Sequence, residues 1–259
     1  RVLFRSVFGI LKRLCFERNH TVLWLSFLKK NNMDIPSIDS GPIWLSLQLA
    51  GVTVGLLLVF ATPVAWWLAH TRSRFRVVVE AVVALPLVLP PTVLGFYLLI
   101  LLGPNGWVGG PVQALTGSAL SFSFTGLVFA SMLYSLPFVV QPLHSAFESV
   151  GKIPMETAQS LGASRLDAFF TVISPLARRG YLTAIVLGFA HTLGEFGVVL
   201  MVGGNIPGKT KVISIEIYDR VEVMEYAQAH ILSAGLLLFS FFVLVMVYTV
   251  NRRLPVQVT

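Results

Sequence analysis

Glu195 is the residue of this sequence whose type and position point most directly to chemistry. It lies in Leu193–Met201 (LGEFGVVLM), within a long run that holds no other acidic or basic residue except His191, four positions earlier on the same helix face. A carboxylate is costly inside a membrane, so it usually faces a bundle interior or a watery cavity. The pattern therefore indicates a gate, a conformational latch, an ion relay or a hydrogen-bonded structural carboxylate.

Catalysis and metal binding find little support in the residue types. His191 and Glu195 alone are too few to hold a metal ion, so no metal site is predicted. For an anionic substrate, Glu195 is not expected to be a direct ligand, because like charges repel; a structural or gating role fits better. The sequence contains no Ser-His-Asp order, no paired carboxylates and no CxxC grouping. We predict no catalytic residue and no cofactor in this chain.

One stretch matches a nucleotide-binding pattern by its letters alone. Gly203–Thr210 (GGNIPGKT) fits G-x-x-x-x-G-K-[ST], whose backbone cradles phosphates between a β-strand and a helix of a soluble α/β domain. Here an apolar run precedes the stretch and no βαβ pattern follows. The Gly-Gly and Pro-Gly pairs instead predict a turn.

Composition identifies the elements that must position these residues. The 259-residue chain is 55% hydrophobic and 12% charged, against roughly 25% charged in soluble domains. Because barrel strands are shorter and alternate, these runs are predicted to be helices, and the fold class is an all-α membrane protein. Five runs reach the roughly 20 residues that a membrane-crossing helix needs: Ile43–Ala69, Val77–Leu102, Phe122–Leu143, Tyr181–Gly204 and Ala229–Val250.

The second of these spans carries the sequence Leu85–Gly95 (LPLVLPPTVLG). Prolines free backbone carbonyls, which a membrane tolerates only where protein or a water-filled cavity satisfies them. We therefore predict a kinked helix lining a translocation path, with a kink that only helps bundle packing as the alternative. The candidates for the path or gate are Pro90, Pro91, Thr92, Glu195 and Gly197.

Lys and Arg residues predict the orientation of the spans. The loops after the first and third spans and the C-terminal tail hold nine of them, whereas the loops after the second and fourth spans hold three. The positive-inside rule places the richer set in the cytoplasm, so the first span starts outside and the C-terminus is cytoplasmic. The nine are Arg72, Arg74, Arg76, Lys152, Arg165, Arg178, Arg179, Arg252 and Arg253; the three are Lys209, Lys211 and Arg220.

Residues 1–32 contradict that orientation. They hold seven of the 19 Lys and Arg residues and one of the 12 acidic residues, so without them the net charge falls from +7 to +1. The first methionine is Met33, and we predict that 1–32 are upstream sequence translated by mistake or a fragment boundary, with 33–259 as the membrane domain. An extra helix around Thr21–Leu28 is the rival, although that run is too short to span alone. A basic nucleic-acid arm is disfavoured by the interspersed Phe, Trp and Leu.

A polar loop follows the third span, between residues 144 and 180. Pro154 suits a first helical position and Glu156 a first turn, where the helix dipole favours a carboxylate. Gly162 suits a left-handed stop, and Ser164 with Asp167 resembles a capping box that opens a second helix. A compact helix–Gly–helix loop on one side of a membrane protein is suited to docking a partner.

This loop resembles the EAA loop of ABC importer permeases, through Glu156, Ala158, Gly162, Val172 and Pro175. Thr157 and Ser174 depart from the pattern, which has alanine and leucine at these positions. The resemblance implies the ABC importer permease fold and an ATPase-coupling loop formed by Glu156, Ala158, Leu161, Gly162 and Pro175. It further implies that Ala158 lets the loop approach a groove closely and that Gly162 makes the turn.

Three further stretches narrow the resemblance to molybdate permeases of ABC importers: Leu85–Gly95, Leu193–Met201 and Gly204–Tyr218. Sulfate, thiosulfate and tungstate permeases are the nearest alternatives. The resemblance implies a homodimer in the inner membrane and a cytoplasmic ATPase that holds the ATP and magnesium. It also implies an extracytoplasmic molybdate-binding protein, and no nucleic acid.

Two open alternatives concern the outer side and the driving force. Lys211–Gln228 mixes apolar and charged residues and is expected to form a short amphipathic helix at the surface, either docking a binding protein or merely connecting two spans. An ion-coupled secondary transporter with Glu195 as relay is the rival mechanism. It would carry an inverted repeat, which the sequence does not show.

Overall fold

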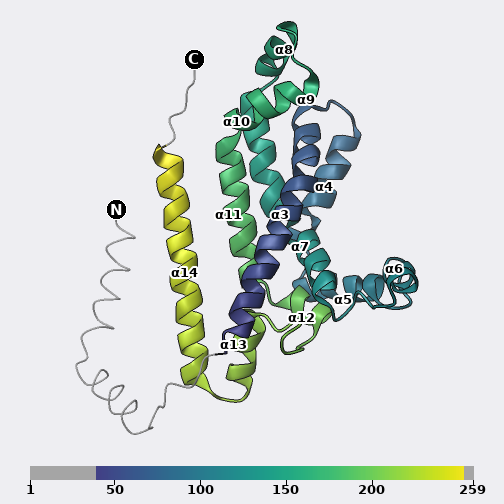
Figure 1. Cartoon of the computed structure of the whole chain (residues 1–259), viewed down its shortest axis with the longest axis vertical. Helices are drawn as coiled ribbons and strands as arrows, with labels where there is room; N and C mark the ends of the chain where they lie inside the picture. The colour runs from purple at the N-terminus through teal and green to yellow at the C-terminus, as the bar shows by residue number, and fades with distance from the viewer. Residues whose placement is uncertain (1–38, 254–259) are drawn as a thin grey trace, which may run out of the picture. The chain divides into compact units, whose positions relative to one another are not determined.

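The computed structural model describes residues 39–253, and the regular elements of this part are all helical (Figure 1). The predictions for residues 1–32 lie outside the described residues. In chain order the elements are α3 (Gly41–His70), α4 (Phe75–Val88), α5 (Pro91–Leu102), α6 (Gly109–Thr116), α7 (Phe124–Val150), α8 (Ile153–Ser160), α9 (Arg165–Ala168), the π-helical turn η1 (Phe169–Ile173), α10 (Ser174–Leu176), α11 (Arg178–Gly194), α12 (Gly197–Gly203), α13 (Ile213–Glu222) and α14 (Tyr226–Arg253).

The five predicted spans correspond to three long helices and two broken pairs. Within the described residues, α3, α7 and α14 are each long and apolar enough to cross a membrane. The α4–α5 pair bends by 112° and the α11–α12 pair by 62°, so the number of spans rises to five if each pair is one span. The all-helical prediction is confirmed.

The bend at α4–α5 is much larger than the kink that the sequence suggested. Pro86 is tolerated inside α4, but the helix ends at Val88 and a new one begins at Pro91, with Pro90 preceding it. Consecutive prolines explain this break, because neither can donate a backbone hydrogen bond and Pro91 suits a first helical position. The kinked helix predicted over Val77–Leu102 is thus two separate helices in the structure, and α5 turns away from α4 and packs on α12.

The core forms where α3, α7 and α11 pack on one another. Leu57, Leu143 and Phe147 are among its fully buried side chains. The Phe147 ring meets Trp66 edge-on at a centroid distance of 5.3 Å, and the tilted ring of Phe169 lies 6.0 Å away. Helix α11 meets its neighbours through small residues, since Gly180, Ala184 and Gly188 are buried along it. This core supports the two ends of the bundle that carry the candidate sites.

Figure 1 shows α8 and α9 at one end of α7 and α11, and α13 at the other end. The amphipathic helix expected within Lys211–Gln228 is present as α13, but Ile213, Ile215 and Glu216 are buried against its neighbours. The backbone N–H of Ile213 donates to the Ser46 hydroxyl of α3 at 2.8 Å. Helix α13 is thus fastened to the bundle along one face.

Candidate functional site

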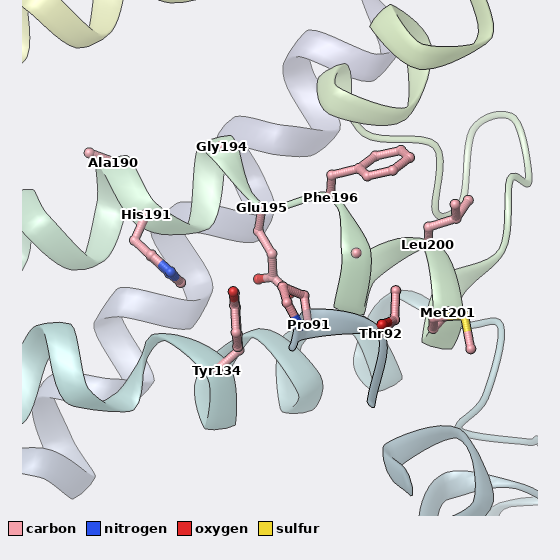
Figure 2. A pocket seen from close by; sticks show the side chains of 11 residues that line it. Pro91, Thr92, Tyr134, Ala190, His191, Gly194, Glu195, Phe196, Leu200 and Met201 are labelled. Atoms are coloured by element: carbon pink, nitrogen blue, oxygen red, sulfur yellow. The ribbon is translucent and has the colours of Figure 1, made fainter. Parts of the chain in front are cut away.

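A cavity of about 600 Å³ lies beside the break between α11 and α12, and Figure 2 shows the side chains around it. Helices α5, α7, α11 and α12 contribute to its wall. It brings together four of the five path candidates, Pro91, Thr92, Glu195 and Gly197; Pro90 precedes α5 and is not among the lining residues. The remaining lining residues are Tyr134, Ala190, His191, Gly194, Phe196, Leu200 and Met201.

Close packing of α5 against α12 depends on Gly197. A Cβ atom at this position would lie 2.7 Å from the Cβ of Pro91, a separation that real Cβ atoms do not show. The proline ring cannot rotate away from such a contact, so only glycine lets the two broken helices meet at this point. Gly197 therefore has a packing role beside the cavity.

Glu195 is the residue that caps the C-terminal end of α11, and only 4% of its surface is exposed. Its backbone carbonyl accepts a 2.6 Å hydrogen bond from the Ser214 hydroxyl of α13. Neither carboxylate oxygen has a hydrogen-bond partner. The buried Ser131 hydroxyl of α7 lies near the carboxylate, but the two do not meet hydrogen-bond geometry. The side chain is thus an unpartnered buried acid.

His191 is held by a chain of hydrogen bonds between α11 and α7. The Thr192 hydroxyl donates to the Gly188 carbonyl at 2.9 Å, so its single proton is engaged. Ser135 must then donate to Thr192 across 3.0 Å, and the 2.9 Å contact between Ser135 Oγ and His191 Nδ1 requires Nδ1 to donate. In the neutral ring Nε2 is therefore an acceptor.

Sequence reasoning missed the side chains of α7 at this site. Ser131, Tyr134 and Ser135 follow the spacing i, i+3, i+4 and so share one face of the helix, toward Glu195 and His191. Such a polar stripe in an otherwise apolar span was the signal that could have found them.

The predicted docking loop forms the opposite end of the bundle. Pro154 and Glu156 lie in the first turn of α8, and Gly162 has a left-handed backbone with φ of +93°. No atom lies within 4 Å of the place a Cβ would take at Gly162, so the backbone conformation alone favours glycine here. The Ser164 hydroxyl accepts from the N–H of Asp167 at 3.2 Å and so caps α9. The structure therefore contains the helix–Gly–helix loop that the sequence predicted.

Ala158 is 8% exposed, so its side chain packs within this end of the chain. Pro175 lies in α10 and is exposed. The accessible apolar side chains of this end are Ile153, Leu161, Leu166, Phe170 and Leu176.

Gly203 ends α12 and residues 204–210 form the predicted turn; no strand precedes it in the described part of the chain. Thr210 is fully buried and its Oγ1 accepts from the N–H of Ile206 at 3.1 Å. This hydroxyl closes the turn, which explains the threonine without a phosphate.

An ion-pair cluster fastens this turn to α13. Lys211 Nζ lies 2.7 Å from Glu216 Oε2 and 2.7 Å from Asp219 Oδ2, and Arg220 Nε lies 2.6 Å from Glu216 Oε1. Burial raises the pKa of Glu216, but the hydrogen bonds from Lys211 and Arg220 together lower it by more than burial raises it. The pKa of Glu216 is therefore below its ordinary value. Glu216 is thus a buried carboxylate held in its ionised form.

Comparison with known proteins gives a consistent picture. The family model of the binding-protein-dependent transport system inner membrane component matches residues 61–255. The molybdenum transport system permease protein ModB of Azotobacter vinelandii is 59% identical over 220 residues, which cover 85% of this chain and 97% of that protein. The sulfate transport system permease protein CysT of Synechocystis sp. is 35% identical over 189 residues, covering 73% and 66% of the two chains.

A chain of a bacterial alginate ABC transporter, solved in complex with an alginate pentasaccharide-bound periplasmic protein, has a TM-score of 0.66 at 18% sequence identity. The alignment covers 97% of this chain and 93% of that one. At this identity the likeness concerns the fold, which is that of an ABC importer permease.

Proposed function

Because the chain belongs to the family of binding-protein-dependent transport system inner membrane components, we propose that it is the permease subunit of a molybdate importer. ATP would be hydrolysed by a separate subunit, with its magnesium bound there. The observation that carries the proposal is the 59% identity across 97% of a molybdenum transport permease. The sulfate relative matches at 35% and over a smaller share of its length, so sulfate, thiosulfate and tungstate are the alternative cargoes.

The ATPase is proposed to dock on α8, the Gly162 turn and α9. This end exposes Ile153, Leu161 and Leu166, whose side chains are at least 73% accessible. Glu156 and Pro175 are accessible on the same loop, whereas Ala158 supports it from within. Since α8 and α9 connect α7 to α11, movement of this loop would reach the cavity through those two helices.

The translocation path is proposed to run between two copies of the chain, past the cavity that holds Thr92 and Glu195. The charge distribution supports placing the α8–α9 end and the C-terminus in the cytoplasm. The turn after α12 and α13 would then face outward, where a molybdate-binding protein delivers the ion. The solved alginate ABC transporter is likewise in complex with a periplasmic protein, which carries an alginate pentasaccharide.

The test is uptake of labelled molybdate into proteoliposomes that contain the chain, its ATPase and its binding protein, with sulfate as competitor. We expect uptake that requires all three components and resists excess sulfate. Gly162→Pro should abolish it, because proline cannot adopt the left-handed backbone. Gly117→Pro is the matched control: Gly117 also has a positive φ (+74°) and open space around it, but it ends α6, away from the docking loop.

Two results would overturn parts of this proposal. Uptake that sulfate abolishes would change the substrate to sulfate and leave the mechanism intact. Equal loss in both glycine variants would show that the coupling assignment of the Gly162 turn is wrong.

A further inference from the structure

Glu195 has no partner for its charge among the described residues, although it lies inside the membrane part of the fold. Both carboxylate oxygens are buried without a hydrogen bond, and the cavity wall contains no lysine or arginine. An ionised carboxylate in such a place is strongly disfavoured unless a positive charge compensates it. Something outside the described side chains must therefore neutralise it.

The backbone around Glu195 adds to this demand. Glu195 caps the C-terminal end of α11, where the helix dipole is negative and the last carbonyl groups lack intrahelical partners. A carboxylate at this end is repelled by the helix that carries it. The N-terminal end of α5, where the helix dipole is positive, also lies beside the cavity, but no hydrogen bond joins it to the carboxylate.

The other polar groups of the cavity offer acceptors for a positive occupant. His191 lines it with an Nε2 that is an acceptor in the neutral ring, because Nδ1 donates to Ser135. The hydroxyl oxygens of Tyr134 and Thr92 belong to the same wall, and Figure 2 shows Tyr134 extending toward Glu195. His191 from α11 and Tyr134 from α7 are the other titratable groups facing Glu195, while the lining residues of α5 and α12 do not titrate.

We propose that the cavity at the α11–α12 break is a cation site, in which the Glu195 carboxylate holds a proton or a small alkali cation. A divalent or transition metal does not fit, because within residues 39–253 no group of three or more His, Cys, Asp and Glu is placed to hold one. One carboxylate beside the Tyr134 and Thr92 hydroxyls and the His191 ring suits a monovalent charge. The C-terminal end of a helix that is broken inside a membrane also favours a cation, because its dipole is negative there.

The consequence for transport rests on the proposed function. An oxyanion that passes the cavity would be repelled by an ionised Glu195 and would not be repelled by the neutralised site. The occupant would thus make the path passable without being the driving force.

The test is infrared difference spectroscopy on the complete transporter in nanodiscs, without substrate or ATP, in sodium, potassium and choline buffers. If the occupant is a proton, we expect a buried carboxylic-acid band that Glu195→Gln removes. If it is an alkali cation, we expect carboxylate bands that shift when choline replaces sodium or potassium, again only while Glu195 is present. Glu216→Gln is the matched control, because Glu216 is equally buried but paired with Lys211 and Arg220.

An ionised Glu195 whose bands are the same in all three buffers would overturn the proposal. If Glu195→Gln does not assemble, Glu195→Asp can replace it, because this variant keeps a carboxyl group. A shift of the infrared band between the unaltered chain and Glu195→Asp would then assign the band to residue 195. Since the spectra need no substrate, a failure of molybdate uptake would contradict the proposed function and leave this result standing.

Discussion

Glu195 and Glu216 are both glutamates with 4% of their surface exposed, but their electrostatic surroundings are opposite. Glu216 lies on α13 between Lys211 and Arg220, in a cluster extended by Asp219. Glu195 lies at a helix break with neither carboxylate oxygen bonded. Burial alone therefore does not define a site: the Glu216 carboxylate is paired and stabilises the structure, whereas the Glu195 carboxylate is open to a ligand.

The largest expected effect comes from removing the charge of Glu216. Glu216→Gln leaves Arg220 with only Glu225 and Lys211 with only Asp219. Breaking a buried ion pair costs about 3–5 kcal/mol, and because Lys211 and Arg220 are partly exposed we expect about 2–3 kcal/mol lost from the free energy of unfolding. Denaturant unfolding in detergent measures it. A change below about 0.5 kcal/mol would remove the contrast with Glu195.

Added volume beside the cavity should be tolerated less well than the replacement of Glu195 by glutamine. Gly197→Ala places a methyl group 2.7 Å from the Cβ of Pro91, and overpacking of this kind costs roughly 1–3 kcal/mol. Gly194→Ala is the matched control on the same cavity, since no atom lies within 4 Å of its Cβ position. Thermal unfolding of both variants checks this; equal stability would mean that α5 and α12 do not meet as described.

Acid should weaken the Glu216 cluster in a defined window. Burial raises the pKa of both Glu216 and Asp219, but their hydrogen bonds, including those from Lys211, lower it more, so each folded pKa lies below its ordinary value of 4.5 or 3.8. Their stabilising contribution is therefore complete above about pH 4.5 and is lost as pH falls through the lowered folded pKa values. We expect the melting temperature to fall below about pH 4.5, and to fall less in Glu216→Gln. An equal fall in melting temperature below about pH 4.5 for the unaltered chain and Glu216→Gln would contradict the pairing of Glu216 with Lys211 and Arg220.

The smallest effect is expected at Glu195 itself. Glu195→Gln removes a carboxyl group without any protein partner, so stability should change by less than about 0.5 kcal/mol or increase. The exposed Glu222→Gln serves as a reference for a neutral surface change. Unfolding at neutral pH compares the two; a loss above about 2 kcal/mol would show that a protein group holds the Glu195 carboxyl.

Local sequence signals located the elements well and their contacts poorly. Hydropathy placed the fourth span at Tyr181–Gly204, close to the bounds of α11 and α12. Gly162 indicated the turn in the docking loop, because glycine adopts a positive φ more readily than other residues. The 112° fold at Pro90 and Pro91 was underestimated, since packing of α5 on α12 sets the angle. The partnership of Ser135 with His191, 56 residues apart, could not be read from either segment alone.

The driving force of molybdate uptake tests the central claim most directly. Proteoliposomes with the complete complex would be given either enclosed ATP or an imposed proton or sodium gradient without ATP, for the unaltered chain and Glu195→Gln. We expect uptake with ATP alone and none with a gradient alone, since the cation held by Glu195 makes the path passable but does not drive transport. Gradient-driven uptake that Glu195→Gln abolishes would contradict it and make the chain an ion-coupled transporter.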